Sequence, residues 1–289
     1  MLPSTLNYAA PTTLGAAVDL LASHPDAVFT AGSYRLLIDL KMQRIDAGTL
    51  VDLRKLTELY GIASVEEGAA YGVEIGAMTA LSTLANDVRL LAHYGALAEA
   101  ASATGDAQIR NMAALGGTLA YDASAGDVAA ALLALDAVIH THHSKGQRSL
   151  DAADFFTSDG KTALRHDEII TMVALPSTSA SSIYEKFTHP ATLEAIIGVA
   201  AAVTLDDAGR VAACRLGVCG SVAQAKRLSA AEAALLGGAL DEAAIAGAAA
   251  SAADGVEWLP SLQASAEYRA HRLGVMTARA LRRLVKAQG

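Results

Sequence analysis

The sequence predicts an α+β protein, with two mixed α+β subdomains followed by a C-terminal antiparallel sheet and a helical bundle. Three observations lead to this fold class. Up to Pro176, short apolar runs typical of strands alternate with stretches whose apolar residues recur at helical spacing. Two longer apolar runs then flank an Asp/Gly turn. In the rest of the chain, apolar residues again recur at helical spacing. No G-x-G-x-x-G sequence follows a predicted strand, which disfavours a Rossmann fold.

The first subdomain is expected over residues 1–55. Apolar residues recur at helical spacing over 13–23 and again over 36–42, which predicts two short helices. Compact apolar runs at 27–30 and 49–53 predict two buried strands. Strands and helices therefore alternate in this part of the chain.

The second subdomain is expected over residues 56–176, with strands and helices in mixed order. One predicted strand ends in His140, His142 and His143, which have no acidic or cysteine partner at metal-ligand spacing. We therefore expect an exposed strand end there and no metal site. The predicted strands are 63–65, 72–76, 137–141 and 169–173, and the predicted helices are 79–86, 90–103 and 128–135.

A linker is expected at residues 176–182, a proline followed by a run rich in serine and threonine. The third unit, 183–286, opens with apolar runs on either side of Asp206-Asp207-Ala208-Gly209, a pattern typical of a β-hairpin. Its last helix is basic and amphipathic, which predicts a solvated face above a buried stripe, with partner docking as the alternative. The hairpin strands are 196–205 and 212–219, and the helices are 229–236, 241–252 and 264–286.

Composition narrows the classes of function. The 289 residues are 53 % hydrophobic and 18 % charged, which predicts packed cores, and a net charge of −8 argues against nucleic-acid binding. The sequence contains no apolar run long enough for a membrane span and no secretory signal. Cys214 and Cys219 are expected to be buried in a protein of a reducing compartment, the cytoplasm. Two thiols are too few for an iron–sulfur cluster, so any metal redox centre would belong to another chain.

The most informative segment is 109–120, Ile-Arg-Asn-Met-Ala-Ala-Leu-Gly-Gly-Thr-Leu-Ala, closed by Ser124 and Asp127. A glycine pair after a polar turn lets backbone N–H groups approach a phosphate closely, because glycine has no Cβ and adopts positive φ at low cost. The sequence Gly-Lys-Thr at 160–162 lacks the upstream glycine of a P-loop. No set of residues is typical of general acid–base catalysis, so we expect the chemistry to come from a bound cofactor.

Four collinear segments resemble the flavoprotein (medium) subunit of the molybdenum hydroxylases, the family of the carbon monoxide, xanthine and aldehyde dehydrogenases. In that family the second FAD-binding motif is close to I-R-N-x-A-T-x-G-G-N-L followed by Ser and Asp, which the segment 109–120 with Ser124 and Asp127 resembles. The other matching segments are the first glycine-rich loop at 31–35, the start of the C-terminal domain at 184–187 and 196–202, and the final helix at 268–272.

The resemblance implies a PCMH-type FAD-binding fold, in which two α+β subdomains clamp FAD. The two glycine loops would hold its diphosphate through backbone N–H groups, and Asp127 and Lys186 would flank the cofactor. It implies no catalytic residue and no metal ligand in this chain. The residues that the resemblance assigns to the cofactor are Ala31, Gly32, Ser33, Tyr34, Arg35, Asn111, Ala114, Leu115, Gly116, Gly117, Thr118, Ser124, Asp127 and Lys186.

The resemblance also implies partners. A subunit of this kind takes electrons from [2Fe–2S] clusters of a small subunit and passes them to an external acceptor, while a large subunit carries the molybdenum cofactor. The implied assembly is a dimer of heterotrimers.

Both glycine loops depart from the family pattern. In the first loop, Ser33 replaces a glycine, Tyr34 replaces a smaller residue and Arg35 replaces a small polar or acidic one; in the second, Ala114 and Thr118 replace Thr and Asn. Arg35 can pair with phosphate oxygens, or it can occupy part of the cofactor's space. Two hypotheses follow: an FAD-binding electron-transfer subunit, or a family member with lost or altered flavin binding that acts as a structural or interaction subunit.

Overall fold

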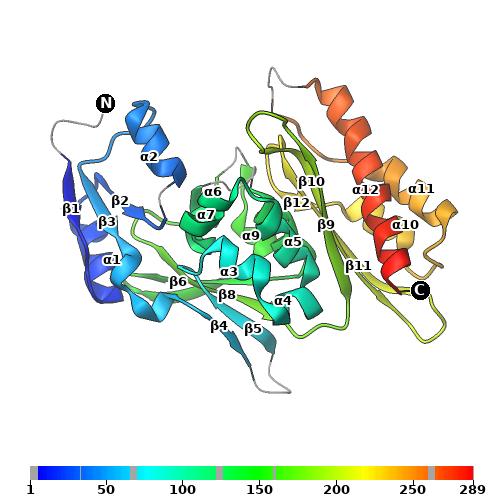
Figure 1. Ribbon diagram of the computed structural model, residues 1–289, viewed down its shortest axis with the longest axis horizontal. Helices are drawn as coiled ribbons and strands as arrows, with labels where there is room; N and C mark the ends of the chain where they lie inside the picture. Colours follow the sequence, from blue (N-terminus) through cyan, green and yellow to red (C-terminus); the bar gives the residue numbers. More distant parts are fainter. Residues whose placement is uncertain are drawn as a thin grey trace.

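The structure is a computed structural model that describes residues 6–32, 34–65, 70–121, 126–158, 161–259 and 264–288. Figure 1 shows a small N-terminal unit (blue), a central layer of helices on a sheet, and a C-terminal sheet (yellow-green to yellow) with helices on its outer face (orange to red). The predicted α+β class is confirmed.

The N-terminal unit is a three-stranded parallel sheet in the order β1-β3-β2. Helix α1 begins after Thr13, whose side chain accepts a hydrogen bond from Ala16 N at 3.3 Å. Helix α2 has a small core of its own, in which Leu36 and Leu40 pack near Leu50. The elements are β1 (Asn7–Ala9), α1 (Leu14–Ser23), β2 (Ala27–Thr30), α2 (Tyr34–Lys41) and β3 (Thr49–Asp52).

The central sheet has five antiparallel strands in the order β4-β5-β8-β6-β7. The expectation of an exposed strand end at the histidines is wrong. Strand β6 lies between β7 and β8, so His143 is buried and His140 and His142 are half-buried. The strands are β4 (Ile62–Ser64), β5 (Tyr71–Gly76), β6 (Val138–His143), β7 (Gly146–Asp151) and β8 (Ile169–Pro176).

The helical layer differs from the sequence prediction in several places, and the helix over 107–112 was not predicted. The single helix expected over 90–103 is broken at Tyr94, whose hydroxyl donates to Pro176 O at 2.9 Å. The glycine pair lies in the first turn of a short helix, not in a loop. The helices are α3 (Leu81–Asn86), α4 (Val88–His93), α5 (Gly95–Ala103), α6 (Ala107–Met112), α7 (Leu115–Tyr121), α8 (Asp127–Ala134) and α9 (Ala152–Phe155).

The C-terminal unit is an antiparallel sheet in the order β12-β11-β10-β9, with the predicted hairpin between β10 and β11. Gly209 closes the hairpin turn with φ of 74°. Helices α10, α11 and α12 cover one face of the sheet, as Figure 1 shows. The elements are β9 (Ser181–Thr188), β10 (Ala195–Leu205), β11 (Val211–Gly220), β12 (Lys226–Arg227), α10 (Ser229–Leu235), α11 (Glu242–Ser251) and α12 (Ala266–Gln288).

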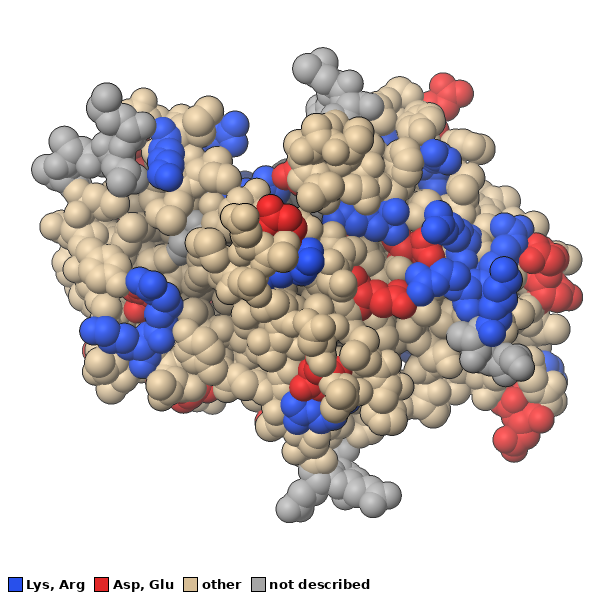
Figure 2. All heavy atoms as spheres, viewed as in Figure 1, with Lys and Arg blue, Asp and Glu red and all other residues tan. Residues whose placement is uncertain are grey.

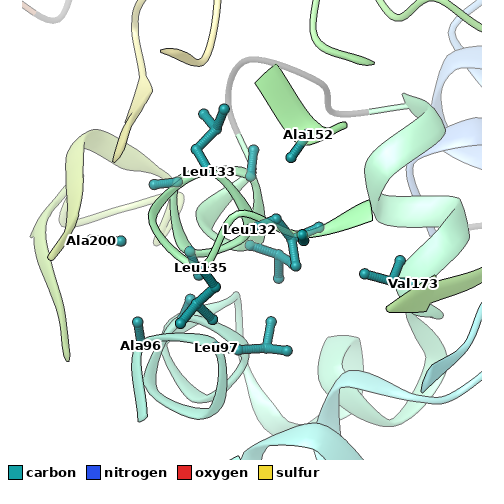
Figure 3. Close-up of a cluster of buried hydrophobic side chains, with 14 of the residues drawn as sticks. Ala96, Leu97, Leu132, Leu133, Leu135, Ala152, Val173 and Ala200 are labelled. Carbon is teal, nitrogen blue, oxygen red and sulfur yellow. The ribbon is translucent and has the colours of Figure 1, made fainter. Parts of the chain in front are cut away.

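The main core forms where α5 and α8 lie between the central and the C-terminal sheets. Figure 3 shows Leu132 and Leu133 of α8 among side chains from α5, β8 and β10. Every residue of α8 is buried, which explains why its sequence is apolar on all sides. A Cβ on Gly217 of β11 would overlap Ala130 O, so this glycine allows α8 to pack directly on the sheet. The central and C-terminal units therefore share one core.

Helix α12 carries much of the positive charge, and Figure 2 shows Lys and Arg gathered over it with acidic side chains among them. Arg279 and Arg283 pair with the buried carboxylate of Glu185, both within 2.9 Å. The other face of the helix is buried against the C-terminal sheet. The predicted solvated face above a buried stripe is thus confirmed. Among the described helices, none is long and apolar enough to cross a membrane.

Candidate functional site

A cleft lies where the N-terminal unit, helices α6 and α7, and the C-terminal unit meet. Three segments far apart in the sequence line it: the start of α2, residues 113–121, and the β9–β10 loop at 192–195. Residues 164–170 line it as well. The cleft is mostly apolar, with a few polar side chains from different elements, which is typical of cofactor sites.

The two glycine-rich segments are packed against each other. A Cβ on Gly32 would overlap Met112 O, and a Cβ on Gly117 would overlap Ala31 O. Gly32 has φ of 74°, as expected for a glycine loop. At the second pair, neither Gly116 nor Gly117 has a positive φ. These glycines are required for close packing, which brings both segments to the same cleft.

Only some of the backbone amides in the second glycine-rich segment have a hydrogen-bond acceptor. Leu115 N donates to Thr79 O at 3.0 Å, and Gly116 N donates to Ala77 O at 2.7 Å. In the described part of the chain, the amide of Gly117 has no acceptor, and this residue lines the cleft. The first amides of a helix have no acceptor within the helix itself, and Gly117 is half-buried, so this amide is available to an acceptor on a ligand.

Asp127 forms a polar wall of the cleft at the first position of α8. Its side chain accepts hydrogen bonds from Lys186 Nζ at 2.8 Å, from Thr104 Oγ1 at 3.2 Å and from the Tyr184 hydroxyl. Burial raises the pKa of Asp127 although the Lys186 ammonium and these donors oppose the shift. A Cβ on Gly198 would overlap the Tyr184 hydroxyl, so this glycine makes room for the network.

Two polar bridges from α2 cross the cleft. Arg35 Nη1 donates to Glu194 Oε1 of the β9–β10 loop at 2.8 Å. Asp39, one helical turn later, accepts a hydrogen bond from the Tyr121 hydroxyl of α7. That hydrogen bond is the main reason why the pKa of Asp39 is lowered. Helix α2 is therefore tied both to α7 and to the β9–β10 loop.

Glu168, the residue directly before β8, lines the cleft, and its side chain is fully buried. Burial alone would raise its pKa, but hydrogen bonds from Arg148, Thr141 and Arg165 N lower it to about 2. These bonds measure 2.5–2.9 Å. Glu168 is thus a fixed negative charge whose oxygens are already engaged.

The structure brings most of the predicted site residues to the cleft, but not all of them. Asn111 is exposed on α6, and Leu115 is buried in the main core. Gly32 lies behind the cleft against Met112, and Lys186 lies behind Asp127. Ser33 and Ser124 lie outside the described residues. The predicted residues that line the cleft are Ala31, Tyr34, Arg35, Ala114, Gly116, Gly117, Thr118 and Asp127.

Sequence reasoning missed the walls formed by 164–170 and 192–195. The second of these carries a weak signal, because His189-Pro190 with Thr192 is typical of a turn between strands. Nothing in the sequence indicates that this turn faces the glycine loops.

Comparison with known proteins identifies this architecture. The family model of the FAD-binding domain in molybdopterin dehydrogenase matches residues 4–178, and that of the CO dehydrogenase flavoprotein C-terminal domain matches residues 182–284. The chain belongs to the flavoprotein (medium) subunits of the molybdenum hydroxylases. The resemblance stated from the sequence is confirmed, and the chain is an oxidoreductase subunit with an FAD-binding domain.

Individual members of this family match nearly the whole chain. The carbon monoxide dehydrogenase medium chain of Hydrogenophaga pseudoflava is 31 % identical over 284 residues, covering 97 % of both chains. The nicotine 6-hydroxylase medium subunit of Paenarthrobacter nicotinovorans is 30 % identical over 264 residues, covering 91 % of this chain and 92 % of that protein. A solved structure of the Hydrogenophaga pseudoflava enzyme lacking its Mo-pyranopterin moiety superposes with a TM-score of 0.90 at 32 % identity, covering 98 % of both chains.

Proposed function

We propose that this chain is the FAD-binding electron-transfer subunit of a molybdenum hydroxylase complex, and that FAD binds in the cleft between the two glycine segments. The observation that carries the proposal is the convergence of both segments on one cleft, lined by the Gly117 amide, which has no acceptor among the described residues. The FAD-binding domain matched over residues 4–178 supports the same cofactor.

The residues of the cleft fit this cofactor. The amide of Gly117 and the guanidinium of Arg35 are donors suited to a diphosphate, and α2 and α7 both begin at this side of the cleft. Asp127 offers a carboxylate to hydroxyl groups, with Lys186 behind it as its counter-ion. The apolar surface of Phe29, Met78 and the neighbouring residues excludes water from the rest of the cofactor.

Bound FAD would supply a redox group that takes up electrons singly or in pairs. The role of the chain is to bind and orient it, because none of the described residues around the cleft forms a catalytic acid–base pair. We propose that electrons arrive from [2Fe–2S] clusters of a small partner subunit and leave to an external acceptor. A large subunit would hold the molybdenum cofactor, in a cytoplasmic dimer of heterotrimers. Relatives named as medium chains or subunits support this division.

A binding experiment tests the proposal. Full-length chain is titrated with FAD by isothermal calorimetry, and the visible spectrum of the protein is recorded after gel filtration. We expect about one FAD per chain with flavin absorption bands that comigrate with the protein. A colourless protein that releases no heat with FAD would refute the proposal and favour the structural-subunit hypothesis. As a control, Gly247→Ala should bind FAD like the unmodified chain, because this residue lies on the exposed face of α11 with nothing within 4 Å of an added Cβ.

A further inference from the structure

The ion pair between Arg35 and Glu194 joins two units of the chain across the cleft. Arg35 comes from the first turn of α2, and Glu194 comes from the β9–β10 loop of the C-terminal unit. Both residues line the cleft. Their side chains are 33 % and 44 % exposed, so water screens the pair and the arginine can change its partner at low cost.

Helix α2 does not depend on this pair for its position. Asp39, on the same face of α2 as Arg35, is bonded to Tyr121 of α7. Leu36 and Leu40, on the adjacent side of the helix, anchor it in the N-terminal unit. Arg35 would therefore stay at the cleft when its guanidinium leaves Glu194.

The β9–β10 loop presents Glu194 from a preformed turn. His189 Nδ1 accepts a hydrogen bond from Thr192 N at 3.2 Å, and Leu193 N donates to His189 O at 3.0 Å. Leu193 has φ of 60°, a left-handed conformation that is uncommon for a leucine. The loop thus holds its carboxylate beside Arg35 by its own backbone geometry.

We propose that Glu194 competes with the FAD diphosphate for Arg35, so that Arg35 exchanges the carboxylate for phosphate oxygens when FAD binds. Carboxylate and phosphate oxygens are alternative acceptors for the same guanidinium fork. The exchange leaves Glu194 unpaired near a second negative group, so Glu194 lowers the affinity for FAD and Arg35 raises it. This inference rests on the proposed function, since it places FAD in this cleft.

Two substitutions of opposite effect test the exchange. In the full-length chain, Arg35→Gln should weaken FAD binding about tenfold or more, whereas Glu194→Gln should tighten it by about two- to tenfold. Riboflavin, which lacks the diphosphate, should bind all three proteins equally. Arg210→Gln and Glu242→Gln, which make the same charge changes at exposed ion pairs outside the cleft lining, should leave the affinity for FAD unchanged.

Other results would overturn the exchange. Equal weakening of FAD binding by both substitutions would mean that the pair is only a structural tie between the units. Equal effects on riboflavin and FAD would mean that the diphosphate is not involved. If the unmodified chain binds no FAD, the proposed function fails by itself. Titration with inorganic pyrophosphate then decides whether Arg35 is an anion partner, which requires binding that Arg35→Gln removes and Glu194→Gln strengthens.

Discussion

Gly32 and Gly117 each leave room for the segment that carries the other: the first packs on Met112 O and the second on Ala31 O. The two segments are therefore parts of one packed unit. Their contact fixes the shape of the cleft, because a side chain on either glycine has to push the segments apart.

We expect Gly117→Ala to destabilise the chain by about 1–3 kcal/mol through overpacking and to weaken FAD binding about tenfold or more. The added methyl group would have to displace backbone atoms of Ala31, which cannot give way as a flexible side chain would. Urea unfolding and FAD titration measure both effects. Gly247→Ala should instead stabilise the protein by about 0.5–1 kcal/mol, because it adds a good helix former in open space. Equal effects of the two substitutions would contradict this account.

Removing Lys186 should leave Asp127 as a buried, uncompensated carboxylate. We expect Lys186→Met to lower the free energy of unfolding by about 3–5 kcal/mol at pH 8. The loss should be smaller at pH 5, because the pKa of Asp127 is already raised by burial and rises further without the lysine. Asp127 then binds a proton on folding, so stability falls as pH increases. Denaturant unfolding at the two pH values checks this, and adding Asp127→Asn to the variant should remove the pH dependence.

We expect Glu168 to stabilise the folded chain by an amount that decreases in acid. Its pKa of about 2 lies below the ordinary 4.5, so its ionised form contributes about 3 kcal/mol at neutral pH. This contribution is fully present above pH 4.5 and is lost as the pH falls towards 2. Glu168→Gln should therefore be less stable than the unmodified chain at pH 7 and differ less from it at pH 3. A difference that stays constant across this range would count against the assignment.

Both cysteines should be inert in the folded chain. Cys214 and Cys219 are at most 1 % exposed, and burial raises the pKa of each thiol to about 12. We expect a chromogenic disulfide reagent to modify neither thiol in the native protein and both in denaturant. Rapid modification of the native chain would show that the C-terminal sheet opens. The sequence prediction that these cysteines are buried is confirmed.

The features predicted well from the sequence are those determined locally. The hairpin around Gly209 follows from turn residues between apolar runs, and helix α1 (Leu14–Ser23) matches the helix predicted over 13–23 from its apolar spacing. The break at Tyr94 was missed, because the contacts on either side of it are with remote residues: Tyr94 donates to Pro176 O, 82 residues away, and Gly95 packs on Ser182 O. The histidine strand was misjudged for the same reason: its neighbour β8 follows later in the chain.

In the candidate site, too, local motifs could be predicted from the sequence, whereas contacts between remote residues could not. The glycine motifs and Asp127 are short, recognisable patterns, and the structure places most of their residues at one cleft. The second glycine pair has a packing role that the sequence did not indicate, since the atoms that leave no room for a Cβ belong to Ala31 and Ala77, which are remote in the sequence. Glu194 carries no motif, and its position depends on the packing of the C-terminal unit.

The positions of the cleft walls along the sequence have a consequence for biosynthesis. During translation, the first wall is complete once residue 36 has been added and the second once residue 121 has been added. The last wall, which contains Glu194, is complete only after residue 195. A nascent chain that has completed both glycine segments still lacks Lys186 and the loop beyond it. Cofactor loading would therefore be a late event on the ribosome or after release, and a flavin-loaded chain would be one whose C-terminal unit has already docked.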